Sequence, residues 1–162
     1  DRRIPFQDYF VRRGHRDHVD ALHFLGSDDA EPAPGVVAAV DAATAVVIAP
    51  SNPPLSIWPI LAVKAVRAAV ERASRVIAVS PLFGGKALKG PAAAVMESLG
   101  LPPGNAGVLE AYDGLITDLV VDTQDAADAD RLGGGVRVHV ADTMITDRDA
   151  AVRFAGHLLE LA

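Results

Sequence analysis

The chain has 162 residues, half of them hydrophobic but only 5% aromatic, so its apolar mass is mostly aliphatic. This length suits one folded domain with a proper core. The net charge of −6 argues against a broad nucleic-acid-binding surface, and the lack of cysteine excludes disulfides, thiolate metal sites and cysteine nucleophiles.

The first 20 residues are the most polar part of the chain. Within them, the spacing of Phe6, Tyr9 and Phe10 suits one face of a short helix or an irregular strand. The start of the chain lacks the apolar stretch of a signal peptide, and no apolar run reaches the roughly 18 residues of a membrane span. We therefore expect a cytoplasmic protein without a membrane partner.

The remaining sequence predicts strands that alternate with helices. Residues 19–25 alternate and predict a strand, whereas residues 45–49 and 76–80 are continuous apolar runs typical of strands buried on both faces. Further strands are predicted at 116–122 and 136–140, and helices at 36–42, 56–72, 92–99, 105–112, 126–132 and 148–161. This order predicts an α/β, Rossmann-like fold, with a mostly parallel sheet and helices on both faces.

The loop after residues 45–49 contains the first candidate binding residues. Ligands of open α/β sheets lie at the carboxyl ends of strands. Ser51 and Asn52 offer hydrogen-bond donors and acceptors there, and the amides at the start of the next predicted helix favour an anion. A plain turn with a helix cap explains the same residues equally well.

The loop after residues 76–80 contains the second candidate set. Ser80 precedes a segment whose glycines, Gly84 and Gly85, allow close approach of the backbone to a ligand. Exposed amides together with Lys86 and Lys89 suit phosphate oxygens, although solvated lysines are the alternative. No Walker A, Gly-x-Gly-x-x-Gly or Gly-x-Ser-x-Gly motif is present.

Three other groups of polar residues are weaker candidates. His15 and His18 have a spacing that suits a metal ion, but a solvated polar segment explains them better. Asp142 and Thr143 follow a predicted strand, where they either reach a ligand or cap a loop. The single tryptophan, Trp58, either flanks the first loop or packs in the core.

These two loops together resemble a hallmark of the 2-phospho-L-lactate transferase family. The resemblance is strongest over residues 48–63 and 79–91, extends to segments 6–12 and 140–144, and covers essentially the whole chain. It implies transfer of a phospholactyl or phosphoenolpyruvyl group from a guanosine diphosphate diester to the ribityl hydroxyl of the deazaflavin Fo. GMP leaves, Mg²⁺ assists, and the product belongs to coenzyme F-420 biosynthesis.

The resemblance also implies roles for single residues. Amides at the strand ends and Lys86 would neutralise the diphosphate, while Ser51 and Asn52 would orient the hydroxyls of donor or acceptor. We expect ligand contacts from both loops, namely from Ser51, Asn52, Ser80, Gly84, Gly85, Lys86 and Lys89.

Only the C-terminal half of the family is matched by this chain. We therefore expect residues 1–162 to form the C-terminal portion of one transferase domain, with an α/β core at 19–162 and a polar segment at 1–18 that can belong to a small subdomain. The Mg²⁺ ligands, the catalytic residues and the main Fo contacts are expected in the absent N-terminal half, so the fragment alone is predicted to be inactive. The apolar helices would permit a homodimer.

Two alternatives to this transferase remain open. Gluconeogenesis-factor-like proteins, which bind nucleotide sugars, share the fold and have comparable loops. Ser80-Pro81, Gly84-Gly85 and residues 89–91 favour the transferase over that family. The third possibility is a non-catalytic fragment that folds and dimerises without turnover.

Overall fold

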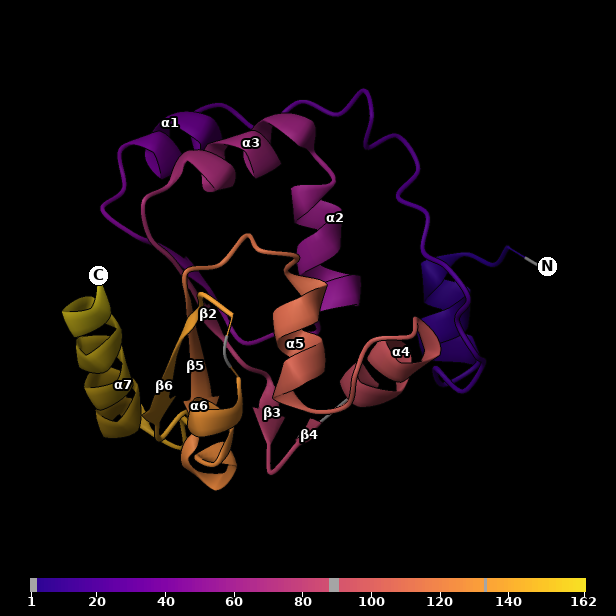
Figure 1. The fold of residues 1–162 in the computed structure, drawn as a ribbon. Coiled ribbons are helices and arrows are strands. Elements are labelled where there is room, and N and C mark those ends of the chain that lie inside the picture. Colours follow the sequence, from indigo (N-terminus) through magenta and orange to yellow (C-terminus); the bar gives the residue numbers. More distant parts are fainter. Residues whose placement is uncertain (1–2, 88–90, 133) are drawn as a thin grey trace.

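The computed structural model describes residues 3–87, 91–132 and 134–162. Within these residues a sheet of four parallel strands has the order β1-β2-β5-β6, and it is flanked by helices (Figure 1). The strands are β1 (Val46–Ile48), β2 (Val76–Val79), β5 (Asp118–Asp122) and β6 (Arg137–Ala141). The predicted α/β, Rossmann-like class is confirmed.

The helices provide the crossovers that parallel strands require. α1 (Val36–Asp41) precedes β1 and contacts α3. Between β1 and β2 lie the π-helical turn η2 (Pro53–Ile57), α2 (Trp58–Leu61) and α3 (Lys64–Arg72), and between β2 and β5 lie α4 (Ala92–Ser98) and α5 (Asn105–Ala111). The 3-10 turn η3 (Thr123–Asp125) and α6 (Asp128–Arg131) lead to β6, and α7 (Arg148–Leu161) follows.

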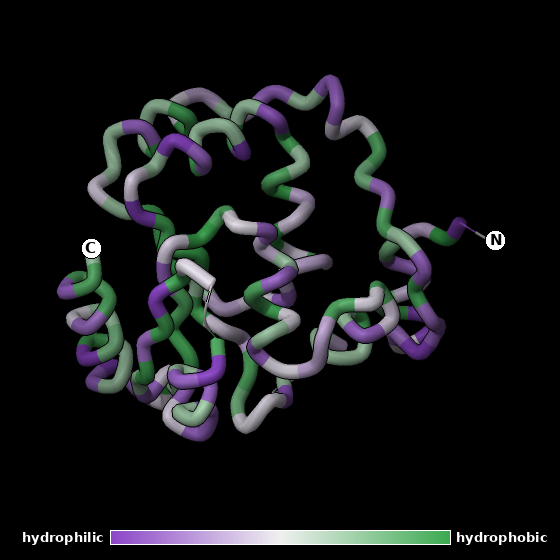
Figure 2. Tube along the Cα trace, in the orientation of Figure 1, coloured by the Kyte–Doolittle hydropathy of each residue, from purple (hydrophilic) through white to green (hydrophobic). Residues whose placement is uncertain are grey.

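The two faces of the sheet bury different sets of side chains. Val76 and Ala78 of β2 belong to the larger core, which α2, α3, α4 and α5 complete, whereas Ile77 and Val79 face Phe154 of α7. Alternate residues of a strand point to opposite faces, so helices on both sides bury β2 completely. The strands are among the hydrophobic, green parts of the trace in Figure 2.

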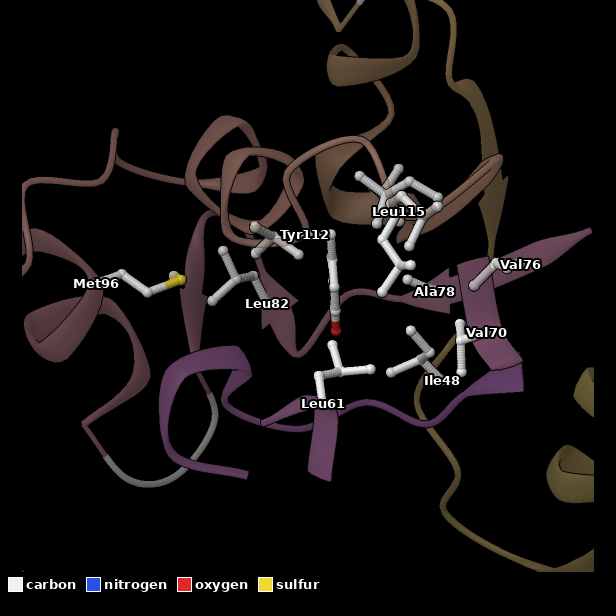
Figure 3. Close-up of a cluster of buried hydrophobic side chains, with 13 residues drawn as sticks. Ile48, Leu61, Val70, Val76, Ala78, Leu82, Met96, Tyr112 and Leu115 are labelled. Carbon is white, nitrogen blue, oxygen red and sulfur yellow. The ribbon is translucent and has the colours of Figure 1, made fainter. Parts of the chain in front are cut away.

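Tyr112 lies in the middle of the larger core. Figure 3 shows its ring among aliphatic side chains, with the hydroxyl oxygen directed toward Leu61. That hydroxyl is buried and has no hydrogen-bond partner among the described residues. Burial accordingly raises the pKa of Tyr112 above its ordinary value.

The predicted strand at residues 19–25 is wrong. This stretch, all of which is described, has no strand structure, and Leu25 is 89% exposed. Alternation alone does not make a strand, because the backbone also needs a hydrogen-bonded neighbour, and the sheet offers none here. The amphipathic pattern therefore belongs to an exposed connection.

The predicted helix over residues 56–72 is interrupted. α2 ends at Leu61, and the extended backbone of Val63 (φ −75°, ψ 104°) precedes α3. Pro59 lies in the first turn of α2, where its missing N–H costs nothing. The indole N–H of Trp58 donates to the carbonyl of Ala111 at 2.7 Å, which fixes the start of α2 against α5.

An ion cluster closes the amino-terminal end of the sheet, opposite the candidate site. Asp118 is fully buried and accepts hydrogen bonds from Arg137, Thr117, His139 and Arg75 at 2.7–3.2 Å. Burial alone would raise the pKa of Asp118, but these donors together hold it well below its usual range. The cluster therefore ties β2, β5 and β6 together.

Candidate functional site

The loops after β1 and β2 lie side by side at the carboxyl end of the sheet, because the two strands pair in parallel. A cavity of about 420 Å³ lies between them, and we call it the aromatic cavity. Ser51 and Asn52 of the first loop line it, as do Pro81 and Phe83 of the second. The structure therefore brings both predicted loops to one space.

The polar N-terminal segment supplies aromatic walls to the same cavity. Phe6 precedes the π-helical turn η1 (Asp8–Arg12), and Phe10 lies within it. Their rings stack with centroids 5.3 Å apart. Both phenylalanines line the aromatic cavity, with Leu55 and Pro91. Flat apolar walls with a few polar groups are typical of sites for planar organic ligands.

Asn52 has an unused hydrogen-bond donor at the aromatic cavity. Its side-chain oxygen accepts from the backbone N–H of Leu55 at 3.2 Å and so caps η2. Its buried Nδ2 has no acceptor among the described residues. The alternative interpretation, a turn with a helix cap, is therefore confirmed, whereas a ligand contact of Asn52 remains a prediction.

The glycine-rich loop forms a hairpin between β3 (Leu82–Phe83) and β4 (Lys86–Ala87). Gly84 and Gly85 have φ values of 58° and 73°, as a two-residue type I′ turn requires. Phe83 and Ala87 line the aromatic cavity, whereas Gly84 and Gly85 line a second cavity. The hairpin therefore contributes to the walls of both cavities, to one through its strands and to the other through its turn.

The second cavity, of about 560 Å³, is lined by charged and amide side chains, and we call it the acidic cavity. The glycine turn and the start of α5 form part of its wall. The remainder comes from the segment that follows β5, including Gln124, Asp125, Asp128 and Arg131. This segment begins at a carboxyl strand end of the sheet, like the two predicted loops.

Ser80 acts as an internal connector. It is fully buried, its hydroxyl donates to Oδ1 of Asn105 at 2.5 Å, and it accepts from the N–H of Leu82 at 3.1 Å. Nδ2 of Asn105 in turn donates to Asp128 at 2.8 Å. This chain of hydrogen bonds joins the hairpin to the far wall of the acidic cavity, so Ser80 positions residues rather than lining either cavity.

Lys86 is exposed on the hairpin, next to Gly85. No carboxylate lies within 4.0 Å of its ammonium group in the parts of the chain that the structure describes. Lys89 lies outside the described residues. The ligand contacts expected of Ser51, Asn52, Gly84, Gly85 and the two lysines remain predictions.

Asp122 organises the end of β5 through its own carboxylate. It accepts hydrogen bonds from the backbone N–H groups of Gln124 and Thr143 and from the hydroxyl of Thr143 at 3.0–3.2 Å. Burial would raise the pKa of Asp122, but these bonds lower it overall. The hydrogen-bonding groups of Thr143 are therefore occupied within the protein. Asp142 is exposed and accepts a hydrogen bond from the backbone N–H of Met144.

Sequence reasoning missed Gln124, Asp125 and Asp128. A signal was present, because Asp122 ends a buried strand, and Asp125 and Asp128 follow it at intervals of three residues. The rule that selected the first two loops also applies to this third strand end. Only the fold shows that it meets the glycine hairpin.

The structure does not group metal ligands at either cavity. Across residues 3–87, 91–132 and 134–162, no three His, Cys, Asp or Glu side chains lie close enough together to hold a metal ion. His18 is exposed and lies 3.5 Å from Asp20. Among the same residues, no helix has the length and hydrophobicity to cross a membrane.

Comparison with known proteins shows which family the chain belongs to. A model of the family "2-phospho-L-lactate transferase CofD" matches residues 1–152. The chain belongs to this family. The match includes η1, both predicted loops and the segment that lines the acidic cavity.

Curated relatives have names that agree with this membership. A "Phosphoenolpyruvate transferase" of Streptomyces griseus is 36% identical over 98% of this chain and 51% of its own length. One of Thermobifida fusca is also 36% identical, over 99% and 49%. A "2-phospho-L-lactate transferase" of Methanopyrus kandleri is 34% identical over 98% and 51%. The chain thus spans about half the length of the curated relatives it matches.

Proposed function

We propose that this chain is the C-terminal portion of a transferase that moves a phospholactyl or phosphoenolpyruvyl group onto the deazaflavin Fo. Family membership supports the general reaction class. The observation that carries the proposal is the pair of cavities that share the β3–β4 hairpin as a wall. Reacting atoms must approach to within about 3–3.5 Å, so we propose that the two ligands meet at the edge of this hairpin.

The proposed reaction is a displacement at phosphorus. The ribityl hydroxyl oxygen of Fo forms a bond to the phosphorus that bears the three-carbon group. The bond from that phosphorus to the bridging oxygen breaks, GMP leaves with the bonding electrons, and the hydroxyl proton is released. Such a reaction depends mainly on positioning and charge neutralisation.

We assign the aromatic cavity to the acceptor. The stacked Phe6 and Phe10 offer planar walls for a ring system, and Ser51 and the unused Nδ2 of Asn52 offer hydrogen bonds to hydroxyls. The acidic cavity then takes the nucleoside end of the donor. Lys86 follows the glycine turn, and we assign its ammonium group to the diphosphate of the donor.

We propose that the residues that bind Mg²⁺ and the catalytic residues lie outside this chain. The described residues contain no cluster that fits the ion. We therefore propose that the 162 residues alone do not turn over, and that the complete enzyme needs a second half of comparable length. Product formed from Fo and the diester by the 162-residue chain alone would contradict this proposal.

Calorimetric titration of the complete enzyme tests the proposed function. We expect GDP to bind and a UDP-sugar not to bind, whereas the opposite result would favour a nucleotide-sugar-binding protein of the same fold. Lys86→Ala should weaken GDP binding roughly 10- to 100-fold, because a charge-assisted hydrogen bond is lost. The matched control is Lys64→Ala, which removes an exposed lysine of α3 that forms an ion pair with Asp28. Unchanged affinity and turnover in Lys86→Ala would remove that residue from the site.

A further inference from the structure

Three side chains form a chain of hydrogen bonds across the carboxyl end of the sheet, and we call it the Ser80–Asp128 chain. Ser80 follows β2, Asn105 begins α5 and Asp128 begins α6. The Ser80 hydroxyl donates to Oδ1 of Asn105 at 2.5 Å, and Nδ2 of Asn105 donates to Asp128 at 2.8 Å. The backbone N–H of Ser80 donates to the carbonyl of Val120 in β5 at 2.8 Å. The Ser80–Asp128 chain therefore starts at the two central strands of the sheet.

Asn105 is the middle member, and the protein uses both ends of its amide. The residue is only 1% exposed, and its amide accepts from Ser80 and donates to Asp128. Asparagine suits this place because one planar group carries both an acceptor and a donor. An aspartate there would set two carboxylates against each other, and neither would supply a proton to the contact. Asn105 can therefore affect a ligand only through the residues that it holds.

The Ser80–Asp128 chain also holds the base of the β3–β4 hairpin. The N–H of Leu82 donates to the Ser80 hydroxyl at 3.1 Å. β3 and β4 pair over only two residues each, and a two-stranded hairpin is marginally stable by itself. Packing holds the buried side chain of Leu82, while this directional bond fixes the orientation of its backbone. Lys86 pairs with Phe83 across the same hairpin, so its position depends on this anchor.

We propose that Asn105 is a positioning residue for the transfer reaction, because it holds the hairpin and thereby Lys86 at the phosphates of the donor. The inference rests on the proposed function for the role of Lys86. Asp128, at the other end of the Ser80–Asp128 chain, lines the acidic cavity, so the same bonds fix the hairpin relative to the far wall of that cavity. A displacement of about 1 Å can slow an enzyme roughly 100-fold, so this anchor matters for turnover as well as for stability.

Exchanging donor and acceptor at the contact between residues 105 and 128 tests the proposal in the complete enzyme. Asn105→Asp places two acceptors face to face and should raise the KM for the diester donor at least about 10-fold. Adding Asp128→Asn restores a donor opposite the new carboxylate, and the Ser80 hydroxyl keeps its acceptor. The double variant should therefore return this KM to within about 3-fold of the unaltered value. The KM for Fo should stay within about 3-fold throughout, because Fo is assigned to the aromatic cavity.

The KM separates positioning from stability. A loss of folded enzyme lowers kcat but leaves KM unchanged, because the remaining folded molecules bind substrate normally. If Asn105→Asp lowers the melting temperature but leaves the donor KM unchanged, the Ser80–Asp128 chain only stabilises the fold and the inference is overturned. If Asn105→Asp does not fold, Ser80→Ala, which removes one hydroxyl, takes its place and should raise the donor KM at least about 3-fold. An unchanged donor KM in folded Ser80→Ala would also overturn the inference.

The control for added charge is Ala126→Asp. Ala126 is exposed and does not line the acidic cavity, although it lies two residues before Asp128. Ala126→Asp should leave the donor KM within about 3-fold of the unaltered value, because an exposed charge is screened by water. If it raises the KM as much as Asn105→Asp does, the added charge explains the effect and the inference fails.

A double-mutant cycle with Lys86→Ala tests whether Asn105 acts through Lys86. Calorimetry of the complete enzyme with GDP gives the affinities. Asn105→Asp should weaken GDP binding about 10-fold when Lys86 is present, but by less than about 3-fold in the Lys86→Ala background, where no ammonium group is left to misplace. Equal effects in both backgrounds would mean that Asn105 does not act through Lys86, and would overturn the inference.

Failure of the inference differs from failure of the proposed function. If the unaltered enzyme binds GDP and forms product while Asn105→Asp keeps the same donor KM, the inference fails and the proposed function stands. If the unaltered complete enzyme neither binds GDP nor forms product from Fo and the diester, the proposed function fails, and this inference fails with it.

Discussion

Replacing Ser80 by alanine should destabilise the protein far more than the loss of one exposed hydroxyl would. The Ser80 hydroxyl is fully buried and makes two hydrogen bonds, one to Oδ1 of Asn105 and one from the N–H of Leu82. Alanine preserves the shape of the backbone but leaves both partner groups without a bond. Because Asn105 is 1% exposed and Leu82 is fully buried, water cannot replace the hydroxyl at no cost.

The magnitude follows from these two groups. An unpaired buried polar group costs about 1–3 kcal/mol, so Ser80→Ala should lower the free energy of unfolding by about 2–4 kcal/mol. For a chain of this size, each kcal/mol corresponds to a shift in melting temperature of about 2–4 °C. We therefore expect a decrease of roughly 5–15 °C.

Urea denaturation, followed by circular dichroism and by the fluorescence of the single Trp58, measures the effect. The midpoint should fall while the slope stays constant, because the surface exposed on unfolding is unchanged. Ser74→Ala is the control, since Ser74 is exposed in the turn before β2. A double-mutant cycle with Asn105→Ala should show a coupling free energy of about 1–2 kcal/mol. If Ser80→Ala stays within about 0.5 kcal/mol of the unaltered protein, the Ser80–Asn105 connection has no structural importance.

Three further substitutions test other parts of the fold. Asp118→Asn should lower the free energy of unfolding by about 3 kcal/mol at pH 7, as measured by urea denaturation. The pKa of Asp118 is lower in the folded than in the unfolded protein, so its ionised carboxylate stabilises the fold above the unfolded-state pKa. That contribution is lost as the pH falls, so the cost of the substitution should shrink below about pH 4. A cost that does not depend on pH would contradict the role of the carboxylate charge. Tyr112→Phe should raise the stability by about 1 kcal/mol, since it removes an unpaired buried hydroxyl; a lower melting temperature would show that the hydroxyl has a partner. Gly107→Ala should destabilise by more than 2 kcal/mol, as a Cβ would lie 2.0 Å from the carbonyl oxygen of Pro102, and a melting temperature equal to that of the unaltered protein would refute this contact.

The strands and helices of the core could be predicted because their signals are local. Continuous apolar runs predicted β1 and β2, and the helix predicted at 148–161 has the bounds of α7. Asp147 caps this helix by accepting the N–H of Ala150 at 2.8 Å. The strand at 19–25 failed for the opposite reason, because a strand depends on a neighbour that local sequence does not specify. The long helix at 56–72 failed where the chain turns at Val63 to bring α3 against α1.

The sequence by itself determined the fold class, the family and the two loops that follow β1 and β2. These features depend on short-range patterns and on motifs that can be recognised in one dimension. Only the tertiary structure decided which polar residues are buried and hydrogen-bonded and which line a cavity. Ser80, expected at a ligand, is fully buried, and the glycine pair forms a turn that lines the acidic cavity. Oδ2 of Asp125 is buried with no hydrogen-bond partner among the described residues. Burial and hydrogen-bond pairing depend on residues far apart in the chain, so no local pattern could have assigned these roles.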